Sequence, residues 1–167
     1  MLNQLRSLKN SNMPVEIERK YLLRNDDWKL SADQGTQFVQ GYLVGSKAAS
    51  VRVRIEGEKA FINIKSATLG VYRKEYEYPI PVDEARELLA TLCEQPLVEK
   101  TRFIVQYDGL EWEIDVFAGE NEGLVVAEVE LEAEDQRINL PPWCGQEVSE
   151  DPRYYNVSLG KQPYSTW

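Results

Sequence analysis

Charged and apolar residues alternate along much of the chain up to residue 131. In the stretch V-E-I-E-R-K-Y (15–21), Glu16, Glu18 and Lys20 take alternate positions, and Arg19 is the one residue that breaks the pattern. Successive side chains of a β-strand point to opposite faces of the sheet. The stretch therefore predicts a strand with one charged and one apolar face, for which a half-exposed surface strand is the ordinary interpretation.

Further segments with the composition of strands follow along the chain. They cover residues 38–44, 50–56, 61–65, 72–80, 98–107, 110–117 and 124–131. Turn signals separate several of them, and Asp108-Gly109 is a strong signal for a two-residue hairpin. Together with the first stretch they predict about eight strands, joined mainly as antiparallel hairpins.

Other segments lack this alternation. Residues 25–37 are polar and predict a loop with at most one helical turn, and residues 132–167, rich in proline and aromatic residues, predict short helices over the sheet. One segment has helical spacing instead, with apolar residues at Ala85, Leu88, Leu89 and Leu92. We expect Asp83 to cap that helix. The fold class predicted is α+β, dominated by antiparallel strands.

Composition favours one soluble domain. The chain has 167 residues, of which 43% are hydrophobic and 28% charged, and single domains commonly have about 100–200 residues. No apolar run approaches the roughly 20 residues of a membrane span. The net charge of -9 argues against binding to a nucleic-acid duplex. We expect residues 1–12 to be a disordered leader, or to reflect a start upstream of Met13, and residues 13–167 to form the domain.

The chain contains no histidine. The most common general base and the imidazole metal ligand are therefore absent, and Ser-His or Cys-His nucleophiles are excluded. An enzyme of this composition must use carboxylates, Lys, Arg, Tyr or a bound metal. Cys93 and Cys144 show neither metal-ligand nor disulfide spacing, so we expect a cytoplasmic protein.

Charges of one sign come in pairs on the predicted charged faces. The cations are Lys20, Arg52, Arg54, Lys65, Arg73, Lys100 and Arg102, and the acids are Glu16, Glu18, Glu75, Glu77, Glu113, Asp115, Glu128 and Glu130. Like charges at neighbouring positions on one face repel. Adjacent carboxylates suit hard divalent cations, and adjacent Arg and Lys suit phosphate oxygens. The pattern leaves two architectures open: a sandwich with its charges in water, and a barrel with its charges inside around a ligand of opposite sign.

These motifs, in this order, resemble the CYTH superfamily, the triphosphate tunnel metalloenzymes, in their short bacterial stand-alone form. The motifs are E-I-E-R-K-Y, R-V-R, N-I-K-S, R-K-E-Y-E, V-E-K-T-R, E-I-D-V-F and A-E-V-E-L, and the similarity runs from about residue 14 to residue 159. The resemblance implies an antiparallel β-barrel of eight strands, a tunnel with a charged lumen flanked by a few helices. It also implies Mg²⁺ or Mn²⁺ as cofactor.

The resemblance further implies a role for each motif residue. The metal ligands would be Glu16, Glu18, Asp115, Glu128 and Glu130. The seven cations named above would bind the phosphates, with Lys20, Lys100 and Arg102 as catalytic residues. A second metal or the orientation of the basic residues would involve Glu75, Glu77 and Glu113, and both roles stay open.

The function that fits best is a metal-dependent hydrolase that releases phosphate from inorganic triphosphate through a metal-activated water. A short chain has little beyond the tunnel with which to recognise a base or a thiamine ring. The alternatives are an adenylate cyclase that makes cyclic AMP from ATP, a thiamine triphosphatase, and a non-catalytic module that binds polyphosphate. The expected partner is a small-molecule triphosphate, without membrane attachment, and a homodimer stays open.

Overall fold

A computed structural model describes residues 15–46, 48–66 and 72–167 of the chain. The expected leader, residues 1–12, lies outside the described residues, as does most of the loop expected between Ser66 and Gly70. The backbone of Arg73 is described as part of a strand, but its side chain lies outside the described part.

Nine antiparallel strands make up the sheet in the part of the chain that is described. They are β1 (Val15–Leu23), β2 (Thr36–Gly45), β3 (Ala49–Glu56), β4 (Lys59–Ser66), β5 (Tyr72–Ile80), β6 (Val98–Tyr107), β7 (Leu110–Phe117), β8 (Val125–Glu130) and β9 (Cys144–Glu147). The first eight confirm the strands predicted from the alternation, within a few residues at each end. The short strand β9 was not predicted.

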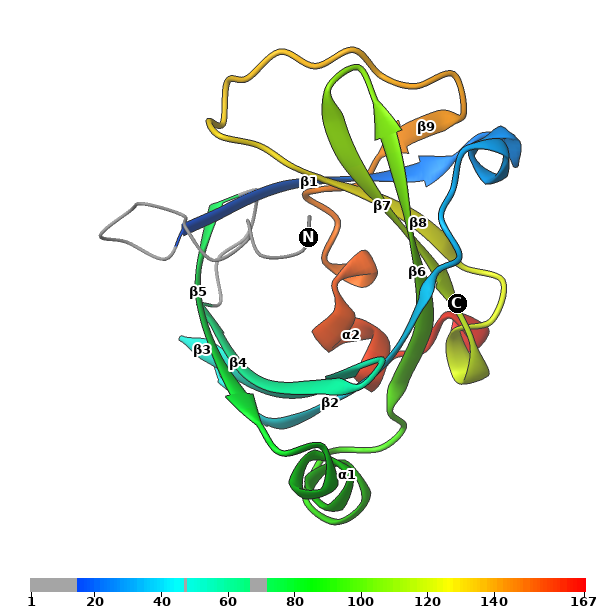
Figure 1. Cartoon of the computed structure of the whole chain (residues 1–167). Coiled ribbons are helices and arrows are strands. Elements are labelled where there is room, and N and C mark those ends of the chain that lie inside the picture. Colours follow the sequence, from blue (N-terminus) through cyan, green and yellow to red (C-terminus); the bar gives the residue numbers. More distant parts are fainter. Residues whose placement is uncertain (1–14, 47, 67–71) are drawn as a thin grey trace.

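The order of the strands brings the two ends of the sheet together. Neighbours pair in the order β5-β4-β3-β2-β6-β7-β8-β1-β9. In addition β1 pairs with β5, where Glu16 lies opposite Arg73 and Ile17 opposite Tyr72. The strands accordingly follow a ring in Figure 1, with β1 and β5 side by side. The predicted turn at Asp108-Gly109 joins β6 to β7, and both residues have positive φ.

Two α-helices and four short 3-10 segments accompany the sheet within the described residues. The helices are α1 (Val82–Thr91) and α2 (Asn156–Lys161), and the segments are η2 (Asp27–Leu30), η3 (Gly119–Asn121), η4 (Pro152–Tyr154) and η5 (Tyr164–Thr166). No described helix is long and apolar enough to cross a membrane. The expected helical turn in residues 25–37 and the expected helix after β5 are both present.

Two details of the prediction for α1 are wrong. Ala85 and Leu89 are buried against the apolar face of β3 and β4, but Leu92 lies beyond the last helical residue and is 63% exposed. Asp83 makes no capping hydrogen bond; the position before the helix is Pro81, and the Asp83 carboxylate instead accepts a bond of 2.9 Å from Arg86. Proline at that position cannot supply a side-chain acceptor, and its fixed φ starts the helix instead.

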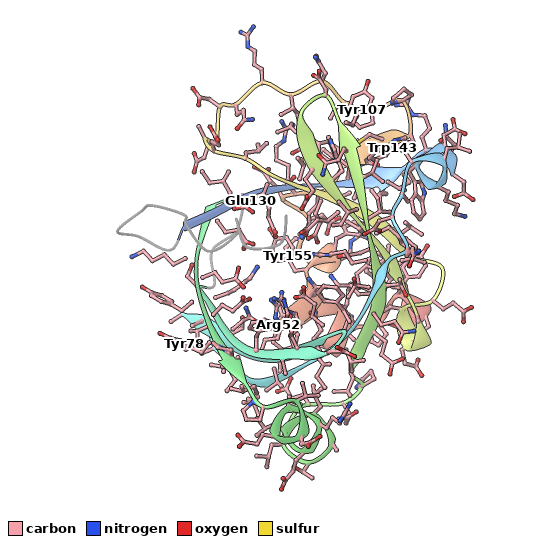
Figure 2. The ribbon with its side chains drawn as sticks, viewed as in Figure 1. Arg52, Tyr78, Tyr107, Glu130, Trp143 and Tyr155 are labelled. Atoms are coloured by element: carbon pink, nitrogen blue, oxygen red, sulfur yellow. The ribbon has the colours of Figure 1, made fainter. Side chains whose placement is uncertain are left out.

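The apolar face of β1, β7 and β8 forms the largest core cluster. Trp112 is fully buried there, with its ring 5.7 Å from that of Tyr21 and 5.4 Å from that of Trp143, centroid to centroid. Figure 2 shows Trp143 on the outer side of the ring of strands. The chain after β8, including β9, covers this outer face, so the apolar positions of the alternation point outward.

Helix α2 packs against the opposite face of the sheet. Its Leu159 is fully buried among Val98, Phe117 and Val126, which lie two residues from Lys100, Asp115 and Glu128 on β6, β7 and β8. The helix lies against β2 and β6 and appears within the ring in Figure 1. The charged face of the sheet therefore ends in an apolar patch under α2.

Candidate functional site

The register of the strands places the alternating charges side by side. On β1 and β8, Glu18 lies opposite Glu130, and Lys20 opposite Glu128. On β6 and β7, Arg102 lies opposite Asp115. Because opposite residues of antiparallel strands project from the same face, the motif residues share the face that carries Leu159 of α2. Figure 2 shows Arg52 of β3 inside the ring and Tyr78 of β5 outside it.

Arg102 is the centre of a first group of charges, the Arg102 group, which consists of Lys20, Lys100, Arg102, Glu113, Asp115 and Glu128. The Nε and Nη2 atoms of Arg102 each donate to an Asp115 oxygen at 2.6 Å, and Nη2 also lies 3.0 Å from Glu128 Oε2. Its Nη1 donates to Glu113. Lys100 donates to Asp115, and Lys20 to Glu128. The three residues expected to be catalytic, one on β1 and two on β6, are thus linked through Asp115 and Glu128 on the strands between them.

The Arg102 group is buried, and burial sets its electrostatics. Asp115 is fully buried, and Lys20 and Lys100 are almost so. Burial disfavours every charge, but Glu128 and Glu18 outweigh it and raise the pKa of Lys20. Likewise Lys20 and Arg102 outweigh burial and hold the pKa of Glu128 well below its usual range. Lys100 differs, because burial and the charge of Arg102 lower its pKa to about 8.

A second group, the Arg54 group, consists of Glu16, Arg52, Arg54, Asn63, Lys65, Glu75 and Glu77. Arg54 lies 2.8 Å from Glu77, and Arg52 lies 3.5 Å from Glu75. Lys65 donates to Glu16 at 2.6 Å. These contacts join β3, β4 and β5 to β1, so the group lies beside the place where β1 and β5 pair.

Asn63 holds the two acids of β5 in the Arg54 group. Its amide nitrogen donates to Glu75 at 2.9 Å and to Glu77 at 2.7 Å, and the residue is fully buried. Sequence reasoning did not single it out. The available signal was its position two residues before Lys65, which places both side chains on the charged face.

Glu16 is the acid of the Arg54 group with the most perturbed ionisation. Burial and the neighbouring carboxylate of Glu18 raise the pKa of Glu16 to about 8, although Lys65 opposes the shift. The pKa of Glu75 moves the other way, because Lys65 and Arg52 outweigh its burial and lower it. The cations of the group therefore satisfy Glu75 more fully than Glu16.

Strand β2, which carries no charge, contributes residues that sequence reasoning also missed. The Phe38 ring lies 5.2 Å from the guanidinium carbon of Arg102 and 5.6 Å from that of Arg54, centroid to atom. Cations over an aromatic face are attracted to it. Tyr42 lies opposite Arg52 and is buried, which raises its pKa. The signal was the alternation of Phe38, Gln40 and Tyr42 itself, which carries aromatic and amide groups in place of charges.

The predicted metal ligands are not gathered at one point. Glu16 is bonded to Lys65, whereas Asp115 and Glu128 are bonded within the Arg102 group. Glu130 is exposed at the end of β8. Among the described residues, no three acidic or cysteine side chains are arranged to hold a metal ion. The predicted phosphate ligands fall into the two groups, apart from Arg73, whose side chain is outside the described part.

Comparisons with known proteins agree with one another. A family model described as CYTH domain matches residues 14–159. An inorganic triphosphatase from Acetivibrio thermocellus is 46% identical over 155 residues, covering 93% of this chain and 99% of the relative. An inorganic triphosphatase from Nitrosomonas europaea is 41% identical over 150 residues, covering 87% and 96%. The crystal structure of the inorganic triphosphatase NE1496 superposes with a TM-score of 0.64 at 37% identity, covering 87% of this chain and 93% of that one.

Proposed function

The chain belongs to the CYTH domain family, and from this premise we propose that it hydrolyses inorganic triphosphate on the charged face of its sheet. The observation that carries the proposal is the burial of Lys20, Arg52 and Lys100 on one face, where a folded protein gains little from them. Two relatives that are 46% and 41% identical to this chain over the aligned residues are inorganic triphosphatases, which supports the same substrate.

We further propose that strands β1 to β8 form a closed barrel whose lumen is lined by the two groups of charges. The pairing of β1 with β5 supports this closure, because β5 is the first strand in the pairing order and β1 is the last but one. A barrel of about eight strands has an interior that side chains fill or that holds one small ligand. A triphosphate is a ligand of that size, and the apolar patch under α2 would limit how far it enters.

The cations of both groups are proposed to bind the phosphate oxygens. Carboxylate oxygens of Asp115, Glu128 and Glu77 now accept bonds from Arg102, Lys20 and Arg54, and phosphate oxygens are acceptors of the same kind. Donors held in position before the reaction stabilise charge on the transferring phosphoryl group at little reorganisation cost. Lys20, Lys100 and Arg102 are proposed to act on that group. Arg73 remains a proposed phosphate ligand.

The acids of the face fit a divalent cation in chemistry. Their ligand atoms are all carboxylate oxygens, as Mg²⁺ or Mn²⁺ prefers. Glu18 lies directly opposite Glu130, so two carboxylates project from one face at this point of the sheet, where Lys20 Nζ lies 3.0 Å from Glu18 Oε1. We propose that Glu16, Glu18, Asp115, Glu128 and Glu130 would hold the metal, which requires Glu16, Asp115 and Glu128 to exchange their present lysine and arginine partners for it. When bound, it would activate water and neutralise phosphate charge.

For the remaining acids we propose an orienting role. Glu113 accepts from Arg102, and Glu75 and Glu77 each accept from Asn63 and lie against an arginine of β3. These bonds fix the directions in which the guanidinium groups point. A second metal would have to displace Asn63 and the arginines together.

The test is a comparison of substrates with Mg²⁺ and with Mn²⁺. We expect rapid phosphate release from tripolyphosphate, slower release from ATP and thiamine triphosphate, and no cyclic AMP from ATP. Chelation of the metal should stop the reaction. Cyclic AMP as the main product, or binding of triphosphate without metal-dependent turnover, would contradict the proposal.

A further inference from the structure

Gln40 lies at the edge of the charged face, beside the Arg54 group. It shares one face of β2 with Phe38 and Tyr42. On that face the Phe38 ring lies near Arg54 and Arg102, and Tyr42 lies opposite Arg52. Across the strands, Gln40 lies opposite Arg54 on β3. On the other side of β2, Gln40 lies opposite Val98 of β6, so it lies where the charged face meets the apolar patch under α2.

The amide of Gln40 is buried without a partner. The residue is 1% exposed, and neither its Nε2 nor its Oε1 has a hydrogen-bond partner among the described residues. Folded proteins pair the great majority of their buried polar groups, because an unpaired one costs free energy. An amide left in this state on a ligand-binding face indicates a ligand that pairs it.

The atoms around this amide point to the kind of ligand. On the neighbouring strand β3, the Nε atoms of Arg52 and Arg54 are also buried without a partner among the described residues. With Gln40 Nε2 they form a set of three unpaired donors on adjacent strands, and such donors suit an oxyanion. Gln40 also adds a donor beside the arginines of β3 without adding a further positive charge, which would repel them.

We propose that Gln40 contacts the substrate directly, its Nε2 donating a hydrogen bond to a phosphoryl oxygen of the bound triphosphate. Its Oε1 then accepts a hydrogen bond from a water molecule beside that phosphate. This inference rests on the proposed function, and it assigns a neutral substrate ligand to a strand that has no charged residue.

A role in the fold predicts a different outcome from a role in binding, and Gln40→Met separates the two. Methionine has a similar length and shape but no hydrogen-bonding group. Because the variant removes an unpaired buried amide, we expect its Tm without ligand to equal or exceed that of the wild type. The kcat/KM for tripolyphosphate should fall about 10²-fold, as when one transition-state donor is lost. The rise in Tm on adding triphosphate should shrink as well.

Gln40→Glu sharpens the test, since it keeps the shape and replaces the donor by a carboxylate. The new charge would pair with Arg54 in the empty protein and repel a phosphate, so the Tm should rise while kcat/KM falls further. Gln37→Met is the matched control, because Gln37 is exposed and projects from the other face of β2. It should leave the Tm, the kcat/KM and the ligand-induced shift unchanged.

The outcomes separate this inference from the proposed function. A Gln40→Met variant with kcat/KM within threefold of the wild type, or with a Tm that falls along with its activity, would overturn the inference. If the wild type does not hydrolyse tripolyphosphate, the proposed function fails. The rise in Tm on adding triphosphate then tests the Gln40 contact by itself. A shift in the wild type that Gln40→Met abolishes would then still support the contact, and no shift in the wild type would overturn it.

Discussion

Two ion pairs of this protein differ in almost everything except their chemistry. Lys100 and Asp115 pair on the inner face with side chains 2% and 0% exposed. Arg19 of β1 and Glu147 of β9 pair through two bonds of 2.8 and 2.5 Å with side chains 27% and 39% exposed. Arg19 is followed directly by Lys20, so one step along β1 leads from the surface to the buried charges.

The difference shows what each pair does for the molecule. An exposed pair keeps most of its hydration and contributes about 0–1 kcal/mol to stability. A buried pair loses hydration that its attraction barely repays, and apolar residues of similar volume are often as stable or more so. Apolar residues would therefore stabilise the fold as well as the charges of the Arg102 group do, or better, and we infer that these charges are kept for what they bind.

The largest expected effect comes from breaking the buried pair at Asp115. Asp115→Ala leaves Lys100 and Arg102 without the carboxylate that they share. Removing one member of a buried pair costs about 3–5 kcal/mol of the free energy of unfolding. Urea denaturation measures it, with Glu147→Ala as the exposed counterpart. A loss at Asp115 as small as that at Glu147 would mean that burial does not distinguish the two pairs.

The second prediction concerns activity. Glu128→Gln with Glu130→Gln keeps the shapes but removes two proposed metal-binding charges, and we expect phosphate release from tripolyphosphate to fall about 10²–10³-fold or more. The circular dichroism spectrum should be unchanged, and excess Mn²⁺ should restore part of the activity. Glu132→Gln with Glu134→Gln makes the same change of charge at exposed positions. Near-normal turnover in the first double variant would remove these residues from the site.

The third prediction concerns binding. A triphosphate at 100 times its dissociation constant should stabilise the wild type by about 2.7 kcal/mol. Arg52→Glu with Arg54→Glu should abolish that gain, because the reversed charges repel phosphate. Arg24→Glu with Arg137→Glu, at exposed positions, should keep it. Melting is compared with sodium sulfate at equal ionic strength; equal shifts with both anions would mean that the inner face has no specific affinity for triphosphate.

Alternation made most of the sheet predictable. A period of two is a property of any strand, so Glu128 and Glu130 on β8, or Arg52 and Arg54 on β3, could be placed on one face from the sequence. The turn at Asp108-Gly109 could be predicted because few residues accept positive φ. The pairing of each acid with its cation could not be predicted, because strand order decides it. Lys65, for example, reaches Glu16 across the β1–β5 junction.

Other features were missed because the alternation of charged residues does not mark them. Strand β9 has four residues, and its pairing with β1 near Tyr21 and Leu23 makes it a strand. Leu92 fits the helical spacing, but the helix ends one residue earlier. Gln40 and Asn63 carry no charge, so a search for charged pairs passes over them. Burial and missing or shared hydrogen bonds, which only coordinates show, mark them as parts of the site.

The smallest expected effect is at the exposed pair. The hydrogen bond from Arg19 lowers the pKa of the Glu147 carboxyl, so the pair's contribution to stability is present above the ordinary pKa of about 4.3 and is lost as the pH falls through the lowered value. Glu147→Gln should therefore cost about 0–1 kcal/mol at pH 7, with the cost shrinking in high salt. It should vanish in acid below the lowered pKa, where the wild-type carboxyl is also neutral. Urea denaturation across this range measures the difference, with Glu150→Gln as an exposed control. A cost above about 3 kcal/mol at pH 7 would put this pair with the buried ones, where removing one partner is expected to cost that much.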